Sequence, residues 1–211
     1  SLVKEYFRAV KEIRPKAFVM ENVSMLSSET HRFYDSAKDH DVVTSLGVQM
    51  REDELVLADY DYNGYSLMNI IQADAVADYK ISDELFQLLN VLYKNRNSEE
   101  RLSKYIKNKS KLIIDKIASQ AEEVKNNLGI LNWIVDMINT EQISACFTEL
   151  GQFIKFQKTF RLKEELDSNE IIYEIENDLQ TGKIIARVKS YSVIEYVNKI
   201  LGDDYKKNSG V

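Results

Sequence analysis

A helical hydrophobic pattern runs through about a hundred residues of this 211-residue chain and limits the folds that it can adopt. Between Leu67 and Phe160, apolar side chains recur every three or four residues, which is the spacing of amphipathic helices. Ser82 and Ser98 each precede acidic residues, a combination that favours a helix start, and Gly129 offers a helix stop. We expect helices within 67–76, 82–92, 98–128, 131–138 and 142–160, packed as antiparallel neighbours in a bundle.

Outside this region the pattern predicts a smaller β component. Residues 171–175 and 184–188 are rich in isoleucine and flank a turn with Gly182, which indicates a β-hairpin near 171–188. Residues 55–57 form a further short candidate strand. Helices are predicted for residues 29–38, which contain His31, and after Ser192 up to Gly202. The predicted fold class is therefore mainly α with a small β component (α+β).

The first 23 residues combine a helix, a proline and an apolar run that ends in polar residues. Apolar side chains from Leu2 to Ile13 follow a helical period, which Pro15 ends. Residues 17–20 then predict a short buried strand, and Glu21 and Asn22 follow at its tip. In open α/β sheets ligands bind at the carboxyl ends of the strands, so Glu21 and Asn22 are candidate site residues. A solvated glutamate, or one that caps the next helix, is the alternative interpretation.

This stretch, with Arg14-Pro15-Lys16 before the apolar run and Glu21-Asn22-Val23 after it, resembles the DNA (cytosine-5)-methyltransferases. The resemblance implies that Glu21 contacts ring nitrogen 3 and the exocyclic amine of a cytosine flipped out of the duplex. Glu21 would act as general acid and recognition group, and Asn22 would hold the loop of the substrate site. It also implies S-adenosylmethionine as methyl donor, DNA as substrate and a role in restriction-modification.

Several parts of that enzyme family are missing from this chain. The family nucleophile is a cysteine that follows a proline, whereas Cys146 here follows Ala145 and is expected to be a small buried hydrophobe. The seven glycines never cluster, so no S-adenosylmethionine site is expected in this chain. The family's Gln-x-Arg-x-Arg motif is also missing. We therefore expect a fragment that is not competent alone and whose partner is the remainder of the methyltransferase chain.

The resemblance suggests how such a fragment is organised. Residues 1–23 would be a helix and the catalytic-motif strand of the core, and residues 192–211, which include Asp204-Tyr205, a helix and strand that return to it. Residues 24–191 would be a mostly helical insertion. The expected architecture is thus a helical bundle inserted between two strand-helix pieces of a Rossmann-like methyltransferase sheet. Unpaired edges of the cut strands would allow self-association.

Charge and aromatic patterns leave two interpretations open. A net charge of −6 excludes a chain that wraps nucleic acid over its whole surface. The basic cluster of Lys104, Lys107, Lys109 and Lys111 is either a phosphate contact or a solvated helix face. The three tyrosines within residues 60–65 either stack on bases or anchor a turn with the Asn-Gly signal.

Metal, membrane and disulfide chemistry are not expected. His31 and His40 lie nine positions apart with no cysteine partners, so they are expected to face solvent rather than to bind a metal. A single cysteine fits a reducing cytoplasm, and no apolar run approaches the ~20 residues of a membrane span. We expect a cytoplasmic protein without a membrane partner. The alternative function is a non-catalytic helical protein-interaction module in which Glu-Asn-Val is a coincidence.

Overall fold

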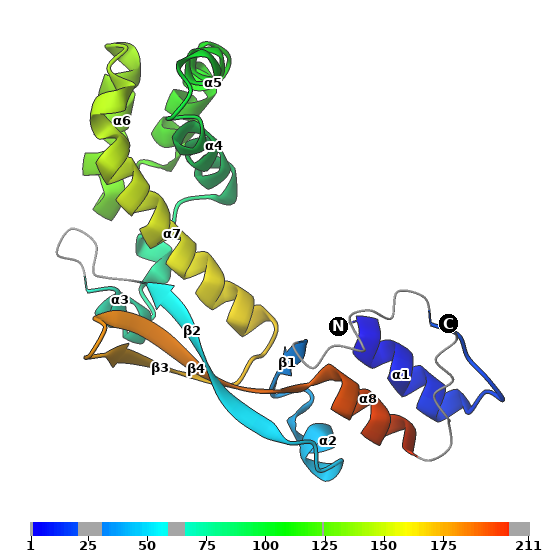
Figure 1. Ribbon diagram of the computed structural model, residues 1–211. Helices are drawn as coiled ribbons and strands as arrows, with labels where there is room; N and C mark the ends of the chain where they lie inside the picture. Colours follow the sequence, from blue (N-terminus) through cyan, green and yellow to red (C-terminus); the bar gives the residue numbers. More distant parts are fainter. Residues whose placement is uncertain (1, 21–30, 59–65, 124, 203–211) are drawn as a thin grey trace. The chain divides into compact units, whose positions relative to one another are not determined.

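A computed structural model describes residues 2–20, 31–58, 66–123 and 125–202 (Figure 1). The chain is mainly helical with a small antiparallel sheet, which confirms the predicted α+β class. It divides into two compact units. Unit 1 comprises 1–55, 166–175 and 186–211, and unit 2 comprises 56–165 and 176–185.

Unit 1 is assembled from segments that lie far apart in the sequence. Its helices and strands are α1 (Leu2–Ile13), β1 (Arg32–Tyr34), α2 (His40–Ser45), α8 (Val193–Leu201), and parts of β2 (Met50–Ala58), β3 (Tyr173–Asp178) and β4 (Lys183–Ser192). The strands follow the order β1-β4-β2, and β3 also pairs with β4, which confirms the hairpin. In the antiparallel β1–β4 ladder, Phe33 lies opposite Tyr191. The central strand β4 therefore pairs with β1 and β2 from the first part of the chain and with β3 from the last part.

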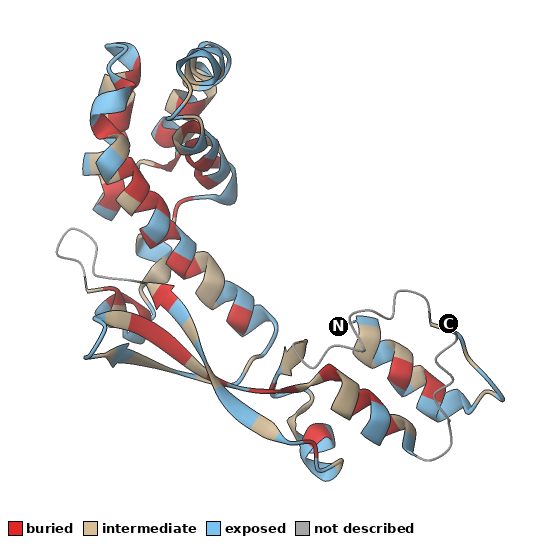
Figure 2. Ribbon diagram, viewed as in Figure 1, coloured by how far each residue is buried: buried red, intermediate tan, exposed pale blue. Residues whose placement is uncertain are grey.

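The core of unit 1 lies where α1 and α8 meet the sheet (Figure 2). Phe7 from α1 and Tyr191 from β4 are almost inaccessible to water. Their buried partners come from α2, the following loop and α8: Val43, Val48, Val193, Tyr196, Val197 and Ile200. Burial of this apolar surface stabilises contacts between segments that are far apart in the sequence.

Unit 2 contains the long helical run. Its helical elements are α3 (Leu67–Gln72), η2 (Val76–Asp78), α4 (Asp83–Lys94), α5 (Glu99–Gln120), η3 (Lys125–Asn127), α6 (Leu128–Asn139), η4 (Ile143–Cys146) and most of α7 (Phe147–Ser168). The predicted starts of two helices are confirmed. The Ser82 hydroxyl accepts a hydrogen bond from the Leu85 amide at 3.3 Å, and the Ser98 hydroxyl accepts one from the Arg101 amide at 3.5 Å.

Buried amide side chains fix the start of α4 against its neighbours in unit 2. Gln157 on α7 accepts a hydrogen bond from the Ile81 amide at 3.0 Å and donates one to the Tyr79 carbonyl at 2.8 Å. Gln120 on α5 accepts one from the Ser82 amide at 2.9 Å. Gln157 is fully buried, and these bonds satisfy its own amide group and the Ile81 amide, while the Tyr79 carbonyl also accepts a hydrogen bond from Asn127.

Two sequence-based boundaries are wrong. The helix predicted for residues 29–38 is instead the strand β1 over its central part, because pairing with β4, about 160 residues away, overrides local propensity. The helix predicted to run from Ser98 to 128 ends at Gln120, and Gly129 lies in the first turn of α6 rather than at a helix end. Both errors fall where the local signal is weak.

Two further expectations concern the sheet and the membrane. The strands of the described residues form an antiparallel sheet, and a parallel Rossmann-like arrangement is not found among them. In the part of the chain that the structure describes, every helix is too short or too polar to cross a bilayer.

Candidate functional site

Glu21 and Asn22, the candidate catalytic and substrate-binding residues, lie outside the described residues, as do Val23 and Asp204-Tyr205. Helix α1 ends at Ile13, and the Arg14 amide closes its last turn on the Val10 carbonyl at 2.9 Å. Arg14 has a positive φ of 50°, and Pro15 follows directly, so the chain leaves the helix abruptly.

Residues 14–20 contain no strand, contrary to the prediction for 17–20. Val19 is 91% exposed, and Ala17 is exposed as well, whereas Phe18 and Met20 pack against the core of unit 1. The alternation is that of an extended segment with one face covered. A strand also requires a ladder of backbone hydrogen bonds, and the described residues provide no such ladder next to this segment.

Aromatic side chains fix the approach to Glu21. The rings of Tyr6 and Phe7 on α1 each lie 6.0 Å from the ring of Phe18, edge to face. The Tyr6 hydroxyl also donates a hydrogen bond to the Val19 carbonyl at 3.0 Å. These contacts hold Phe18 and Val19, which precede Glu21 in the sequence, against α1.

A polar cluster beside this core was not found by sequence reasoning. The Lys4 ammonium lies 2.5 Å from the Asp39 carboxylate and over the rings of Phe33 and Tyr191, at 4.7 and 5.3 Å from their centroids. Burial raises the pKa of Asp39, but the hydrogen bonds and charge of Lys4, with help from Ser36, outweigh it and lower the pKa below its usual value. Lys4 and Asp39 are 35 positions apart in the sequence, so no local motif predicts this ion pair.

Neither histidine belongs to a cluster of potential metal ligands in the part of the chain that the structure describes. The ring of His40 is 43% exposed, as expected for a solvent-facing histidine, but its Nδ1 lies 2.7 Å from the carboxylate of the buried Asp35. Across the described ranges, no three potential ligands from His, Cys, Asp and Glu converge. This arrangement orients His40 without creating a coordination sphere.

Cys146 is buried, as predicted. Its thiol donates a hydrogen bond to the Ile143 carbonyl at 3.2 Å, and burial raises the pKa of the thiol to about 11. A thiol with a raised pKa is protonated at neutral pH and is a poor nucleophile. Cys146 is therefore a packing residue.

Unit 2 contains a cavity of about 320 Å³. Its walls are mainly apolar, with Leu57, Leu67 and Phe156 among them, and its charged side chains are Lys155 and Lys158. Ammonium groups attract the carboxylate of S-adenosylmethionine but repel its sulfonium, so this lining does not identify a site for the methyl donor.

Comparison with known proteins links only the start of the chain to a family. No curated protein and no solved structure matches this chain. Residues 1–46 match the family model described as C-5 cytosine-specific DNA methylase. The matched region contains α1, Glu21, Asn22, β1 and Asp39, and it ends just after α2. The first 46 residues are thus similar to the C-5 cytosine-specific DNA methylases, the family that the start of the sequence resembles.

Proposed function

We propose that this chain is part of a DNA cytosine-5 methyltransferase in which Glu21 binds a flipped-out cytosine. The observation that carries the proposal is the family match over residues 1–46, because it spans Glu21-Asn22-Val23 together with the helix that precedes them. Methyl transfer from S-adenosylmethionine to DNA, within a cytoplasmic restriction-modification system, is the activity proposed for the parent enzyme.

Exposed apolar side chains near the N-terminus support the idea of a missing partner. Leu2 and Val19 are each 91% exposed, and Ile13 is 75% exposed. All three lie in the region that matches the family model, and exposed apolar side chains that come together mark a surface that another protein surface covers. We infer that the remainder of the methyltransferase core covers them.

The family match suggests where the insertion begins. Because the match continues to residue 46, we place the start of the insertion after that residue rather than at 24. Unit 2, which begins at 56, would then form the bulk of it. The return to the core would be the helix and strand expected over residues 192–211.

The chemistry proposed for Glu21 follows from what a carboxyl group can do beside cytosine. Once the base has left the stack, a carboxyl proton can be shared with ring nitrogen 3 while a carboxyl oxygen accepts a hydrogen bond from the exocyclic amine. This interaction withdraws electrons from carbon 6 of the ring and favours attack on it. Asn22 would position the loop. S-adenosylmethionine supplies the methyl group and would be held by parts of the parent enzyme outside this chain.

A matched pair of variants in the parent enzyme tests Glu21. Glu21→Gln keeps the size of the side chain but cannot donate a carboxyl proton, so transfer of labelled methyl groups to duplex DNA should fall by about 100-fold or more. Glu12→Gln, on the exposed face of α1, is the control and should leave transfer unchanged. Unaltered transfer by the Glu21 variant would refute its role.

The alternative, a non-catalytic helical interaction module, is favoured by the fact that unit 2 lies outside the matched region. The coding sequence on either side of this chain separates the two. A methyltransferase requires a proline-cysteine motif upstream and an arginine motif downstream, and the absence of both would favour the interaction module.

A further inference from the structure

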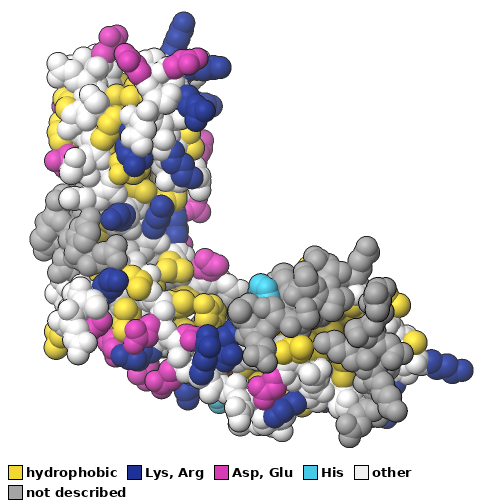
Figure 3. Space-filling view, viewed as in Figure 1, with side chains coloured by type: hydrophobic (Ala, Val, Ile, Leu, Met, Phe, Trp, Pro, Cys, Tyr) yellow, Lys and Arg dark blue, Asp and Glu magenta, His cyan; other side chains and the backbone are white. Residues whose placement is uncertain are grey.

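Positive charge is concentrated in one part of an acidic chain. Residues 94–116, which cover the end of α4 and most of α5, contain eight basic and three acidic side chains, whereas the whole chain has a net charge of −6. Figure 3 shows Lys and Arg side chains gathered over the α4 and α5 end of unit 2. Local concentration of one sign of charge creates a field that attracts polyanions even when the net charge is negative.

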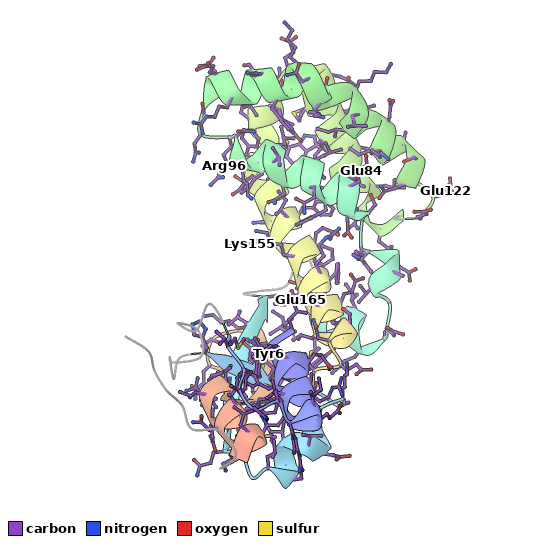
Figure 4. The ribbon with its side chains drawn as sticks, turned by 90° about the vertical axis from the view of Figure 1, so that its right-hand side faces the viewer. Tyr6, Glu84, Arg96, Glu122, Lys155 and Glu165 are labelled. Carbon is purple, nitrogen blue, oxygen red and sulfur yellow. The ribbon has the colours of Figure 1, made fainter. Side chains whose placement is uncertain are left out.

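Four of these side chains lie on one face of α5. Arg101, Lys104, Lys107 and Lys111 are separated by three, three and four residues, so they form a stripe of about 15 Å on the helix. We call these four residues the α5 basic face. All four are exposed, and the buried residues of the helix, Ile113, Ile117 and Gln120, lie on its other side. Figure 4 shows α5 lengthwise, with side chains projecting from its outer side and Arg96 near its start.

The cationic side chains of the α5 basic face have no ion-pair partner among the residues that the structure describes. Within the described residues, no carboxylate lies at ion-pair distance from any of the four, whereas Lys116 pairs with Glu84 at 2.5 Å and Arg161 with Asp83 at 3.0 Å. Lys107 and Lys111 are also four positions apart, a spacing at which like charges repel on a helix. Glu100 and Asp115 are four positions from Lys104 and Lys111, respectively, and mark the two ends of the stripe.

We propose that the α5 basic face binds the phosphate backbone of duplex DNA. A stripe of about 15 Å spans roughly four phosphates along one strand of B-DNA, which matches the number of cations in the stripe. The choice of duplex DNA among polyanions rests on the proposed function, because a cytosine methyltransferase must hold a duplex while one base is flipped. The contact is independent of sequence, since it reaches phosphates and not base edges.

The test is binding of a fluorescently labelled 20-base-pair duplex to the 211-residue chain, measured by anisotropy over a range of salt concentrations. The triple variant Lys104→Ala, Lys107→Ala and Lys111→Ala should bind at least tenfold more weakly at low salt, and its slope of log affinity against log salt should fall by about three. The control removes three exposed lysines of unit 1, Lys11, Lys38 and Lys189, which changes the net charge equally and should alter the slope by less than one. A second triple variant with glutamine at the same α5 positions repeats the test if alanine disturbs the helix.

Three outcomes would overturn the proposal: the α5 variants bind DNA like the unaltered chain, the control loses as much affinity as they do, or the chain binds vesicles rich in phosphatidylserine but not the duplex. Glu21→Gln should leave the salt slope of this chain unchanged. Loss of methyl transfer in the parent and loss of the salt slope are thus separate results, and either proposal can fail without the other.

Discussion

The two units differ in how their sequences encode them. Unit 2 is built mainly from consecutive helices whose starts and faces can be identified from local periodicity, whereas unit 1 brings α1, β1, β4 and α8 together from opposite ends of the chain. Their surfaces differ too. Unit 1 exposes Leu2, Ile13 and Val19 within its first twenty residues, and unit 2 presents the α5 basic face. Unit 1 therefore depends on contacts between distant segments such as α1 and α8, whereas unit 2 depends mainly on contacts between helices that are neighbours in the sequence.

The largest effect is expected in the core of unit 1. Phe7 is 2% exposed, and its ring lies against Tyr6 and Phe18, so Phe7→Ala should lower the free energy of unfolding by about 3–5 kcal/mol in a urea titration. The matched change Leu2→Ala, on the exposed face of the same helix, should alter it by less than about 0.5 kcal/mol. Equal losses would mean that α1 does not bury the face that carries Phe7 and Val10.

A smaller loss is expected from the buried polar network of unit 2. Gln157→Ala leaves the Ile81 amide without its partner, whereas the Tyr79 carbonyl keeps the hydrogen bond from the Asn127 side chain, so the loss should be about 1–3 kcal/mol in the same titration. Gln87→Ala, on the exposed face of α4, is the control and should be close to neutral. A neutral Gln157 variant would show that water replaces the amide.

Two glycines of unit 2 should respond in opposite directions. A methyl group on Gly151 of α7 would lie 2.6 Å from the Tyr93 hydroxyl, so Gly151→Ala should destabilise the protein by about 1–2 kcal/mol. Gly129 in α6 has open space around it, and Gly129→Ala should stabilise the helix by up to about 1 kcal/mol. Thermal unfolding monitored by circular dichroism measures both, and the Gly151 loss should shrink when Tyr93 is also replaced by alanine.

The smallest effect is a pH dependence in unit 1. Because the folded pKa of Asp39 lies below its unfolded value, its contribution is complete above about pH 4 and is lost as the pH falls through the folded pKa. Asp39→Asn should cost about 1 kcal/mol at pH 7 and less at pH 3. Urea titrations at the two pH values check this, and an equal loss at both would contradict the ion pair with Lys4.

Local signals were sufficient for most of unit 2. The caps at Ser82 and Ser98 depend on residues a few positions apart, and α4 and α5 begin directly after them, as predicted. Helix α7, which has no capping serine in its prediction, begins at Phe147 rather than at 142. The predicted helix ran too far because a weak apolar pattern continues past Gln120. In the structure α5 ends at Gln120 and η3 follows. Helix ends are less well encoded than helix starts with a serine cap.

Long-range pairing explains what the sequence did not reveal in unit 1. Strand β1 is only three residues long, and its register opposite Ser190–Ser192 depends on a segment about 160 positions away. The cluster of Lys4, Asp39 and Tyr191 is hidden for the same reason. Glu21 and Asn22, in contrast, were identified from residues that are contiguous with α1, and their roles stay predictions.

The abrupt end of α1 has a consequence for how this segment can vary. Arg14 and Pro15 set the point at which the helix stops, and inward and outward side chains then alternate through Phe18 and Met20. Gain or loss of one residue here would exchange the two faces, drawing Val19 inward, turning Phe18 outward and reorienting everything after Met20. Homologous proteins should therefore tolerate changes of side chain at Ala17 and Val19 far better than a change in the number of residues between the proline and the acid.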